Sequence, residues 1–119
     1  MYTIKVEANF SSAHNLKGYK GKCENLHGHN WKVEVVVAKN KLDKLGMVAD
    51  FRCVKDKLNV ILERLDRKHL NNIAYFKKVN PTSENIAKYI YDCLRSQASG
   101  LESVTVWESE NSSATYSDE

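Results

Sequence analysis

Histidine is scarce in this chain, and three of its four copies lie where two predicted strands begin or end. His27 and His29 are two positions apart, so on a strand they share a face, with Cα atoms about 6.6 Å apart. His14 has the parity of the inward face of the preceding strand, so a hairpin would bring the three imidazoles together. Three neutral imidazoles with one open coordination position are typical of a catalytic zinc, which polarises a bound oxygen. We therefore expect zinc on His14, His27 and His29; the alternative is three separate, hydrogen-bonded histidines.

Cys23 lies four residues before His27, and this spacing leaves two roles open. As a fourth ligand, its thiolate would close the zinc site and make it structural. As a free thiol beside a cation, it would be available as a base or a nucleophile. The spacing alone does not separate the two.

The strands that must position these side chains are predicted by alternating hydrophobicity. Apolar residues occupy every second position in residues 2–10 and again in residues 29–38, as in half-buried strands. Residues 16–25 have no period and are expected to form a loop. Two further strands are expected over residues 101–109 and 113–117.

Two segments between these strands have a helical period. Apolar residues from Phe51 to Leu65 fall on one stripe, and Asp50 before them is a suitable N-cap. A second helix is expected to open at residues 81–84 and to end at Gly100. The order ββααββ predicts an α+β domain, an antiparallel four-stranded sheet with two helices on one face. Its open sheet edges favour edge-to-edge assembly into a larger ring.

Length and composition limit the class of protein. The 119 residues suit a single domain, residues 1–119, and 42% hydrophobic with 28% charged residues is typical of a soluble globule. No apolar run approaches the roughly 20 residues of a membrane span and no signal peptide is recognisable, so a cytoplasmic protein without a membrane partner is expected. A net charge of +3 is too small to indicate a nucleic-acid partner.

Short motifs follow one another along essentially the whole chain. They are Phe10-Ser11-Ser12-Ala13-His14, Cys23-Glu24-Asn25-Leu26-His27-Gly28-His29, Gly46-Met47-Val48-Ala49-Asp50-Phe51, Leu65-Asp66, Leu70-Asn71, Pro81-Thr82-Ser83-Glu84-Asn85 and Val106-Trp107-Glu108. Together they resemble the 6-pyruvoyltetrahydropterin synthase and 6-carboxytetrahydropterin synthase family. The histidine and cysteine motifs are the most specific part of the resemblance.

The resemblance implies the tunnelling fold, trimers whose sheets close into a barrel, and a homohexamer of two stacked trimers. It also implies zinc on the three histidines and 7,8-dihydroneopterin triphosphate as the small-molecule substrate. In such a site zinc polarises the substrate side chain, Cys23 moves protons, Thr82 and Ser83 bind substrate, and Glu108 anchors the pterin ring. A carboxylate suits the anchoring role because it accepts two parallel N–H bonds.

Two details bear on the product. Three residues separate Cys23 from His27, which resembles the 6-carboxytetrahydropterin synthases of queuosine biosynthesis. Glu24 beside Cys23 resembles relatives that cleave the side chain to 6-hydroxymethyldihydropterin for folate synthesis. We expect a carbon–oxygen lyase that makes 6-carboxy-5,6,7,8-tetrahydropterin, with acetaldehyde and triphosphate. The alternatives are a 6-pyruvoyl or 6-hydroxymethyl pterin product and, from another class, a non-catalytic zinc module closed by Cys23.

One position departs from the family pattern. The family usually has Leu-Asp-His after its first helix, with the histidine completing a proton relay, whereas this chain has Leu65-Asp66-Arg67. An arginine stays charged near neutral pH and cannot act as a base. His69 is the only histidine left after zinc takes three, so we expect it to fill the relay, oriented by Asp66. The alternative is a surface histidine, with Arg67 serving the triphosphate.

Overall fold

The computed structural model describes residues 1–18, 21 and 25–118. Its elements follow in the order β1 (Tyr2–His14), β2 (His27–Lys39), α1 (Phe51–Glu63), the 3-10 turn η2 (Leu70–Asn72), α2 (Ala74–Lys78), α3 (Ser83–Leu94), β3 (Leu101–Trp107) and β4 (Ser113–Tyr116). The expected α+β order is confirmed, with η2 and α2 added between the two long helices.

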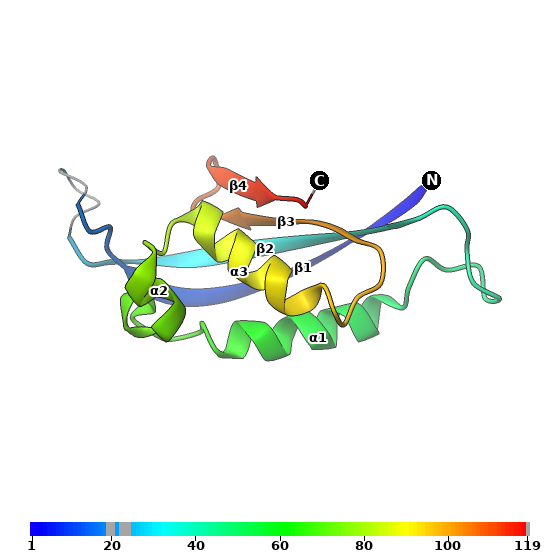
Figure 1. Cartoon of the computed structure of the whole chain (residues 1–119), viewed down its shortest axis with the longest axis horizontal. Coiled ribbons are helices and arrows are strands. Elements are labelled where there is room, and N and C mark those ends of the chain that lie inside the picture. The colour runs from blue at the N-terminus through cyan, green and yellow to red at the C-terminus, as the bar shows by residue number, and fades with distance from the viewer. Residues whose placement is uncertain (19–20, 22–24, 119) are drawn as a thin grey trace.

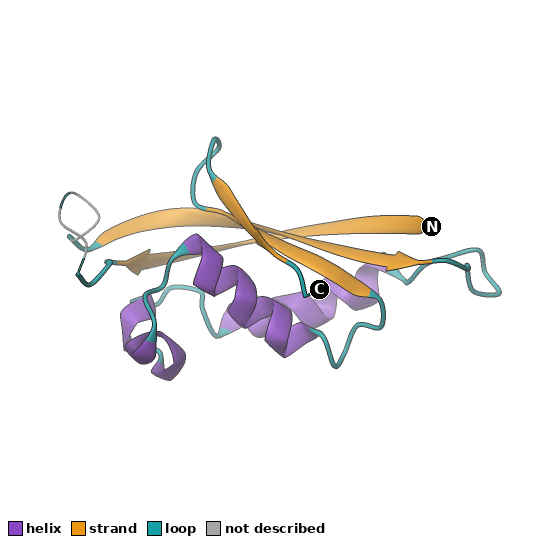
Figure 2. Cartoon of the chain, turned by 45° about the horizontal axis from the view of Figure 1, so that its top comes forward, coloured by secondary structure: helices purple, strands orange, loops and turns teal. Residues whose placement is uncertain are grey.

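The four strands form one antiparallel sheet in the order β1-β2-β3-β4. β1 and β2 are paired without a break from Tyr2 opposite Lys39 to His14 opposite His27. Both long helices lie on one face of this sheet (Figure 1), and Figure 2 shows no helix of the described residues on the other face. The predicted architecture is therefore confirmed.

The core lies between the sheet and the two helices. Each strand turns alternate side chains inward, and the residues with no exposure include Trp31, Val33, Val35, Leu58, Ile61, Ile86, Ile90, Val104 and Val106. Phe10 stacks on Trp31 with ring centroids 5.8 Å apart. This pair ends the apolar part of the β1–β2 hairpin, and the histidines follow it.

The ends of several elements differ from the expectation. β1 continues from residue 10 to His14 and β2 begins at His27. These extensions form because Ser12 and His14, although polar, are buried and hydrogen-bonded to residues distant in sequence. The second long helix ends at Leu94, well before Gly100.

The start of α1 is as expected in one respect and different in another. The Asp50 carboxylate accepts a hydrogen bond from the Arg52 backbone N–H at 2.8 Å, which confirms the predicted N-cap. Phe51, which was expected on the buried stripe, is 61% exposed.

None of the helices in residues 1–18, 21 and 25–118 combines the length and apolar character needed to cross a bilayer.

Candidate metal centre

The three histidines meet where the β1–β2 hairpin opens. His14 is paired with His27 across the two strands, and His29 lies two residues further along β2 on the same face. Their ring centroids are 4.6–5.2 Å apart. Behind them is the fully buried Trp31, whose ring meets His14 and His29 edge-on. The predicted convergence of the three imidazoles is confirmed.

Backbone carbonyl oxygens orient two of these rings. The Nδ1 atom of His14 lies 2.7 Å from the Pro81 carbonyl oxygen, and the Nδ1 atom of His27 lies 2.7 Å from that of Asn25. Because a carbonyl only accepts hydrogen bonds, each Nδ1 must carry the ring proton. In the neutral rings, both Nε2 atoms then present lone pairs, and they lie 3.1 Å apart.

Glu108 adds a carboxylate to this group. It follows β3 directly and has the parity of the buried Val106, so its side chain lies on the same sheet face as the histidines. Its Oε1 atom lies 2.8, 3.3 and 3.8 Å from the Nε2 atoms of His29, His14 and His27 respectively. Alternation along β3 is the sequence signal that places Glu108 on this face.

Burial favours the neutral form of His29. His14 is almost fully buried, while the side chains of His27, His29 and Glu108 are 24–31% exposed. Burial lowers the pKa of His29 below 6.5, and His14 and His27 act in the same direction, whereas Glu108 opposes them. Neutral imidazole is the form that binds metal.

The donor set fits a metal ion. The ligand atoms of the four side chains all lie within 4.8 Å of one another. His29 Nε2 is buried without a hydrogen-bond partner among the described residues, and the Nε2 atoms of His14 and His27 cannot donate to each other in their neutral forms. A cation at the centre would satisfy these lone pairs. Three imidazoles with a carboxylate are ligands that suit zinc.

The model of one protein family, 6-pyruvoyl tetrahydropterin synthase, matches residues 3–119, nearly the whole chain. The chain belongs to this family. The expectation of a synthase enzyme is confirmed with it.

Curated relatives of this chain within the 6-pyruvoyl tetrahydropterin synthase family carry two different enzyme names. A 6-carboxy-5,6,7,8-tetrahydropterin synthase of Synechocystis is 38% identical over 122 residues, which cover 98% of this chain and 93% of that protein. A Rickettsia typhi protein of the same name is 38% identical over 98 residues, covering 68% and 71%. A Drosophila melanogaster 6-pyruvoyl tetrahydrobiopterin synthase is 41% identical over 91 residues, covering 73% and 54%.

A solved structure of the same family has the same fold. The 6-pyruvoyl tetrahydropterin synthase of Caenorhabditis elegans superposes with a TM-score of 0.89 at 31% identity, covering 99% of this chain and 96% of that one. The expected tunnelling fold is therefore confirmed.

Two predicted substrate-binding residues, Thr82 and Ser83, lie beside the group of three histidines and Glu108. Thr82 is the N-cap of α3, and its Oγ1 atom accepts a hydrogen bond from the Asn85 backbone N–H at 3.1 Å. Ser83 is the first residue of that helix. The preceding residue is Pro81, whose carbonyl oxygen holds His14. The start of α3 therefore borders the candidate metal centre.

The expected relay residues are held by other partners. Asp66 Oδ1 accepts the Ser11 backbone N–H at 2.8 Å, and His69 Nε2 lies 3.1 Å from Asn15 Oδ1. Within the described residues, neither side chain forms a hydrogen bond or ion pair with the three metal-facing imidazoles. The relay role therefore stays a prediction.

Arg67, the residue that departs from the family pattern, adopts a left-handed backbone with φ of 55°. Its N–H donates to the Ser11 carbonyl, and Arg67 and Lys68 border a hollow of about 450 Å³ that also meets His29. Non-glycine residues rarely adopt this conformation. The hydrogen bond to β1 therefore holds the backbone of Arg67 in this conformation.

Cys23 and Glu24 lie outside the described residues. Their predicted roles, the proton-transferring thiol and the neighbouring carboxylate, therefore stay predictions.

Asn71, which the sequence analysis named as part of a motif but gave no role, is a structural partner of the site. It is buried at 6% exposure, and its side-chain amide bonds both the N–H and the carbonyl of Asn15, the residue after His14. The carbonyls of Pro81 and Asn25 were missed. Main-chain hydrogen-bond partners cannot be predicted from residue type, since every residue has a carbonyl.

Proposed function

We propose that this protein is a zinc-dependent carbon–oxygen lyase that converts 7,8-dihydroneopterin triphosphate into 6-carboxy-5,6,7,8-tetrahydropterin. The observation that carries the proposal is the convergence of three imidazole Nε2 atoms at the open end of the β1–β2 hairpin. Relatives named 6-carboxy-5,6,7,8-tetrahydropterin synthase, one of them aligned over 98% of the chain, support this product.

In this proposal His14, His27 and His29 hold the zinc ion. Zinc supplies a Lewis acid that polarises hydroxyl and carbonyl oxygens of the substrate side chain. The carbonyls of Pro81 and Asn25 keep the rings of His14 and His27 in the tautomer that binds metal through Nε2. Trp31 closes the site on its inner side and excludes water there.

The remaining roles belong to groups around the metal. Cys23 takes and returns protons, with His69 as its relay partner and Asp66 as the group that orients His69. Glu108 binds the guanidine-like edge of the pterin ring through its carboxylate. The start of α3, with Thr82 and Ser83, binds substrate from the side on which Pro81 contacts His14.

A second candidate is the 6-pyruvoyl product. The Drosophila relative with 41% identity and the Caenorhabditis elegans structure with a TM-score of 0.89 both carry 6-pyruvoyl names. Both candidate reactions start from the same pterin triphosphate and use the same residues, so the product distinguishes them.

The test is to incubate the zinc-loaded protein with 7,8-dihydroneopterin triphosphate and to identify the products by mass spectrometry. We expect 6-carboxytetrahydropterin and acetaldehyde, with His27→Ala as the inactive control. A 6-pyruvoyl product would favour the second candidate instead. Absence of turnover by zinc-loaded protein would contradict both.

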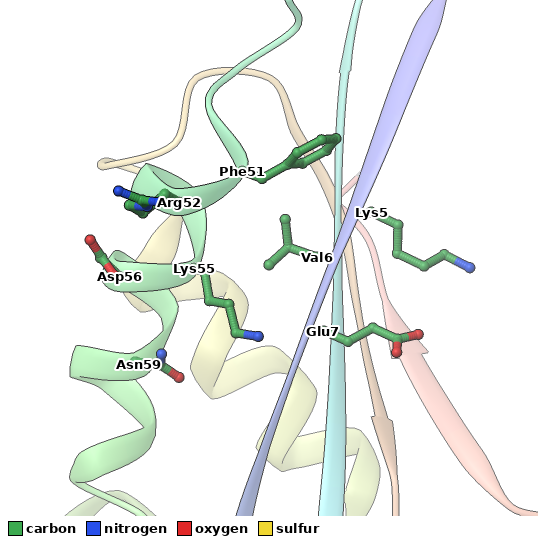
Figure 3. Close-up of a pocket in the computed structure, with 8 residues that line it drawn as sticks. All are labelled: Lys5, Val6, Glu7, Phe51, Arg52, Lys55, Asp56 and Asn59. Carbon is green, nitrogen blue, oxygen red and sulfur yellow. The ribbon is translucent and has the colours of Figure 1, made fainter.

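We also propose that six chains assemble as a dimer of trimers. Within the described residues, β1 pairs only with β2 and, through an isolated bridge at Ala13, with His69. Beside residues 5–7 of β1 is a hollow of about 480 Å³, bordered on the α1 side by Phe51 and Lys55 (Figure 3). An unpaired strand edge of this length supports pairing with a strand of another copy.

A further inference from the structure

The position of the Glu108 carboxylate is not explained by binding a pterin ring alone. Its Oε1 atom is separated from the three imidazole Nε2 atoms by 2.8 to 3.8 Å, and His14 Nε2 is 3.1 Å from His27 Nε2. A tetrahedral zinc ion bonded to nitrogen and oxygen at about 2.0–2.1 Å holds its ligand atoms about 3.3 Å apart. The four measured separations lie on both sides of this value, and all the ligand atoms of the group are within 4.8 Å of one another.

Hydrogen bonding does not account for the arrangement. The Nε2 atoms of His14 and His27 are acceptors because their protons are on Nδ1. His29 Nε2 lies 2.8 Å from Glu108 Oε1, yet its geometry there is not that of a hydrogen bond. A carboxylate oxygen is also an acceptor. The acceptor atoms of His14, His27 and Glu108 therefore converge without protons between them, which indicates that a cation belongs at their centre.

The carboxylate of Glu108 is held less firmly than the rings of His14 and His27. His14 and His27 are each fixed by a second bond to a backbone carbonyl. The backbone N–H of Glu108 bonds the Ser112 carbonyl at 3.1 Å, whereas no hydrogen bond fixes its carboxylate among the described residues. Side-chain rotation would withdraw Oε1 without moving the sheet.

We propose that Glu108 is the fourth metal ligand of the substrate-free protein and that its carboxylate closes the coordination shell until an incoming ligand displaces it. This inference rests on the proposed zinc site. The exchange breaks one metal–oxygen bond and forms one bond to the incoming ligand, and no proton or electron is transferred. The displaced carboxylate is then free to accept N–H bonds, so the pterin-anchoring role and the ligand role alternate.

The test compares wild-type protein with Glu108→Gln, which keeps the size of the side chain but replaces the anionic ligand with an amide. Zinc affinity is measured by competition with a chromophoric chelator, and we expect it to fall about 10-fold or more. In cobalt(II)-loaded protein, azide is titrated while the visible spectrum is recorded. We expect azide to bind Glu108→Gln at lower concentrations than wild type, because the fourth position is no longer held by a carboxylate.

The matched control is Glu110→Gln, an exposed glutamate two residues further along, which should match wild type in both measurements. Circular dichroism establishes that each variant is folded. If Glu108→Gln equals wild type in either zinc affinity or azide titration, the inference is overturned while the three-histidine site stands. Wild-type protein that takes up no zinc would overturn the proposed site, and this inference with it.

Discussion

At the scale of single residues, two of the candidate metal ligands, His14 and His27, are oriented by the partner of their second ring nitrogen. Pro81 and Asn25 each offer a carbonyl oxygen at 2.7 Å, so the rings of His14 and His27 are fixed in both tautomer and orientation. Such outer partners raise the basicity of a ligand and reduce the rotamer freedom lost on binding. The rings of His14 and His27 are therefore already oriented as a metal-binding site would require.

The metal content of two variants tests whether the site depends on histidines alone. His27→Ala should lose most of the zinc, because two histidines form a much weaker site than three. Cys23→Ala should keep about one zinc per chain. Elemental analysis after dialysis against a weak chelator measures both. Zinc loss from Cys23→Ala would support the closed structural site and contradict the proposed lyase mechanism.

The relay position gives a second prediction at this scale. If His69 transfers protons, His69→Ala should reduce turnover by roughly 10²-fold or more while zinc content stays normal. Its hydrogen bond to Asn15 suggests Asn15→Ala as a companion variant that removes this partner but keeps the imidazole. Near-normal turnover by His69→Ala would remove the relay assignment. Arg67→His, which restores the family residue, should then raise the rate.

At the scale of elements, the site depends on segments far apart in sequence that hold the last residues of β1. Residues 67 and 68 bond the backbone of Ser11 and Ala13, and Ser12 Oγ bonds the Leu65 carbonyl. The loop after His14 is held by Asn71 and, at Lys17, by Asn80. These bonds keep β1 extended through polar residues.

Sequence patterns predicted the elements but not all of their ends. Alternation of apolar residues identified the cores of β1 and β2, and the helical period identified α1 and α3, because burial on one face imposes these periods. The extension to His14 could not be predicted from Ser11 and Ser12, whose partners are backbone and side-chain groups distant in sequence. Phe51 lies beside residues 2–7 of the edge strand β1, where no further strand of the described residues covers it.

Asn71 provides the prediction for this scale. Asn71→Ala leaves the N–H and carbonyl of Asn15 without their partner in a partly buried place, so the free energy of unfolding should fall by about 1–3 kcal/mol. Zinc affinity should fall too, because His14 immediately precedes Asn15. Urea unfolding and chelator competition measure the two effects. The control is Asn72→Ala at an exposed position, and equal stability of the two variants would contradict the argument.

At the scale of the whole molecule, the described residues cover one face of the sheet, and they leave its β4 edge and most of its β1 edge unpaired. Figure 2 shows the helices on one side only, and β1 and β4 are the edge strands. The second face of the sheet carries a polar network in which Glu34 accepts from Trp107 Nε1 at 3.1 Å and pairs with Lys5 at 3.7 Å. Such a face is compatible with the lining of a barrel that several copies would close together.

The β1 edge allows this assembly to be tested by a single substitution. In an antiparallel pair, alternate residues direct their N–H groups away from the partner. Ser11 and Ala13 do so, since their N–H groups bond Asp66 and the Lys68 carbonyl. Glu7 has the same parity, and its side chain lies on the side of β1 away from α1 (Figure 3). Glu7→Pro should therefore remove an outward donor without breaking the β1–β2 ladder.

Light scattering at micromolar concentration should give wild-type protein a mass of about 82 kDa, that of six chains of 13.6 kDa. Glu7→Pro should shift this mass towards the monomer, because proline on an edge strand blocks strand addition. Glu7→Ala removes the same carboxylate but keeps the N–H, so it should retain the wild-type mass. Circular dichroism must show that the sheet of Glu7→Pro is intact. A folded Glu7→Pro with the wild-type mass would mean that assembly does not use this edge, and monomeric wild type would contradict the hexamer itself.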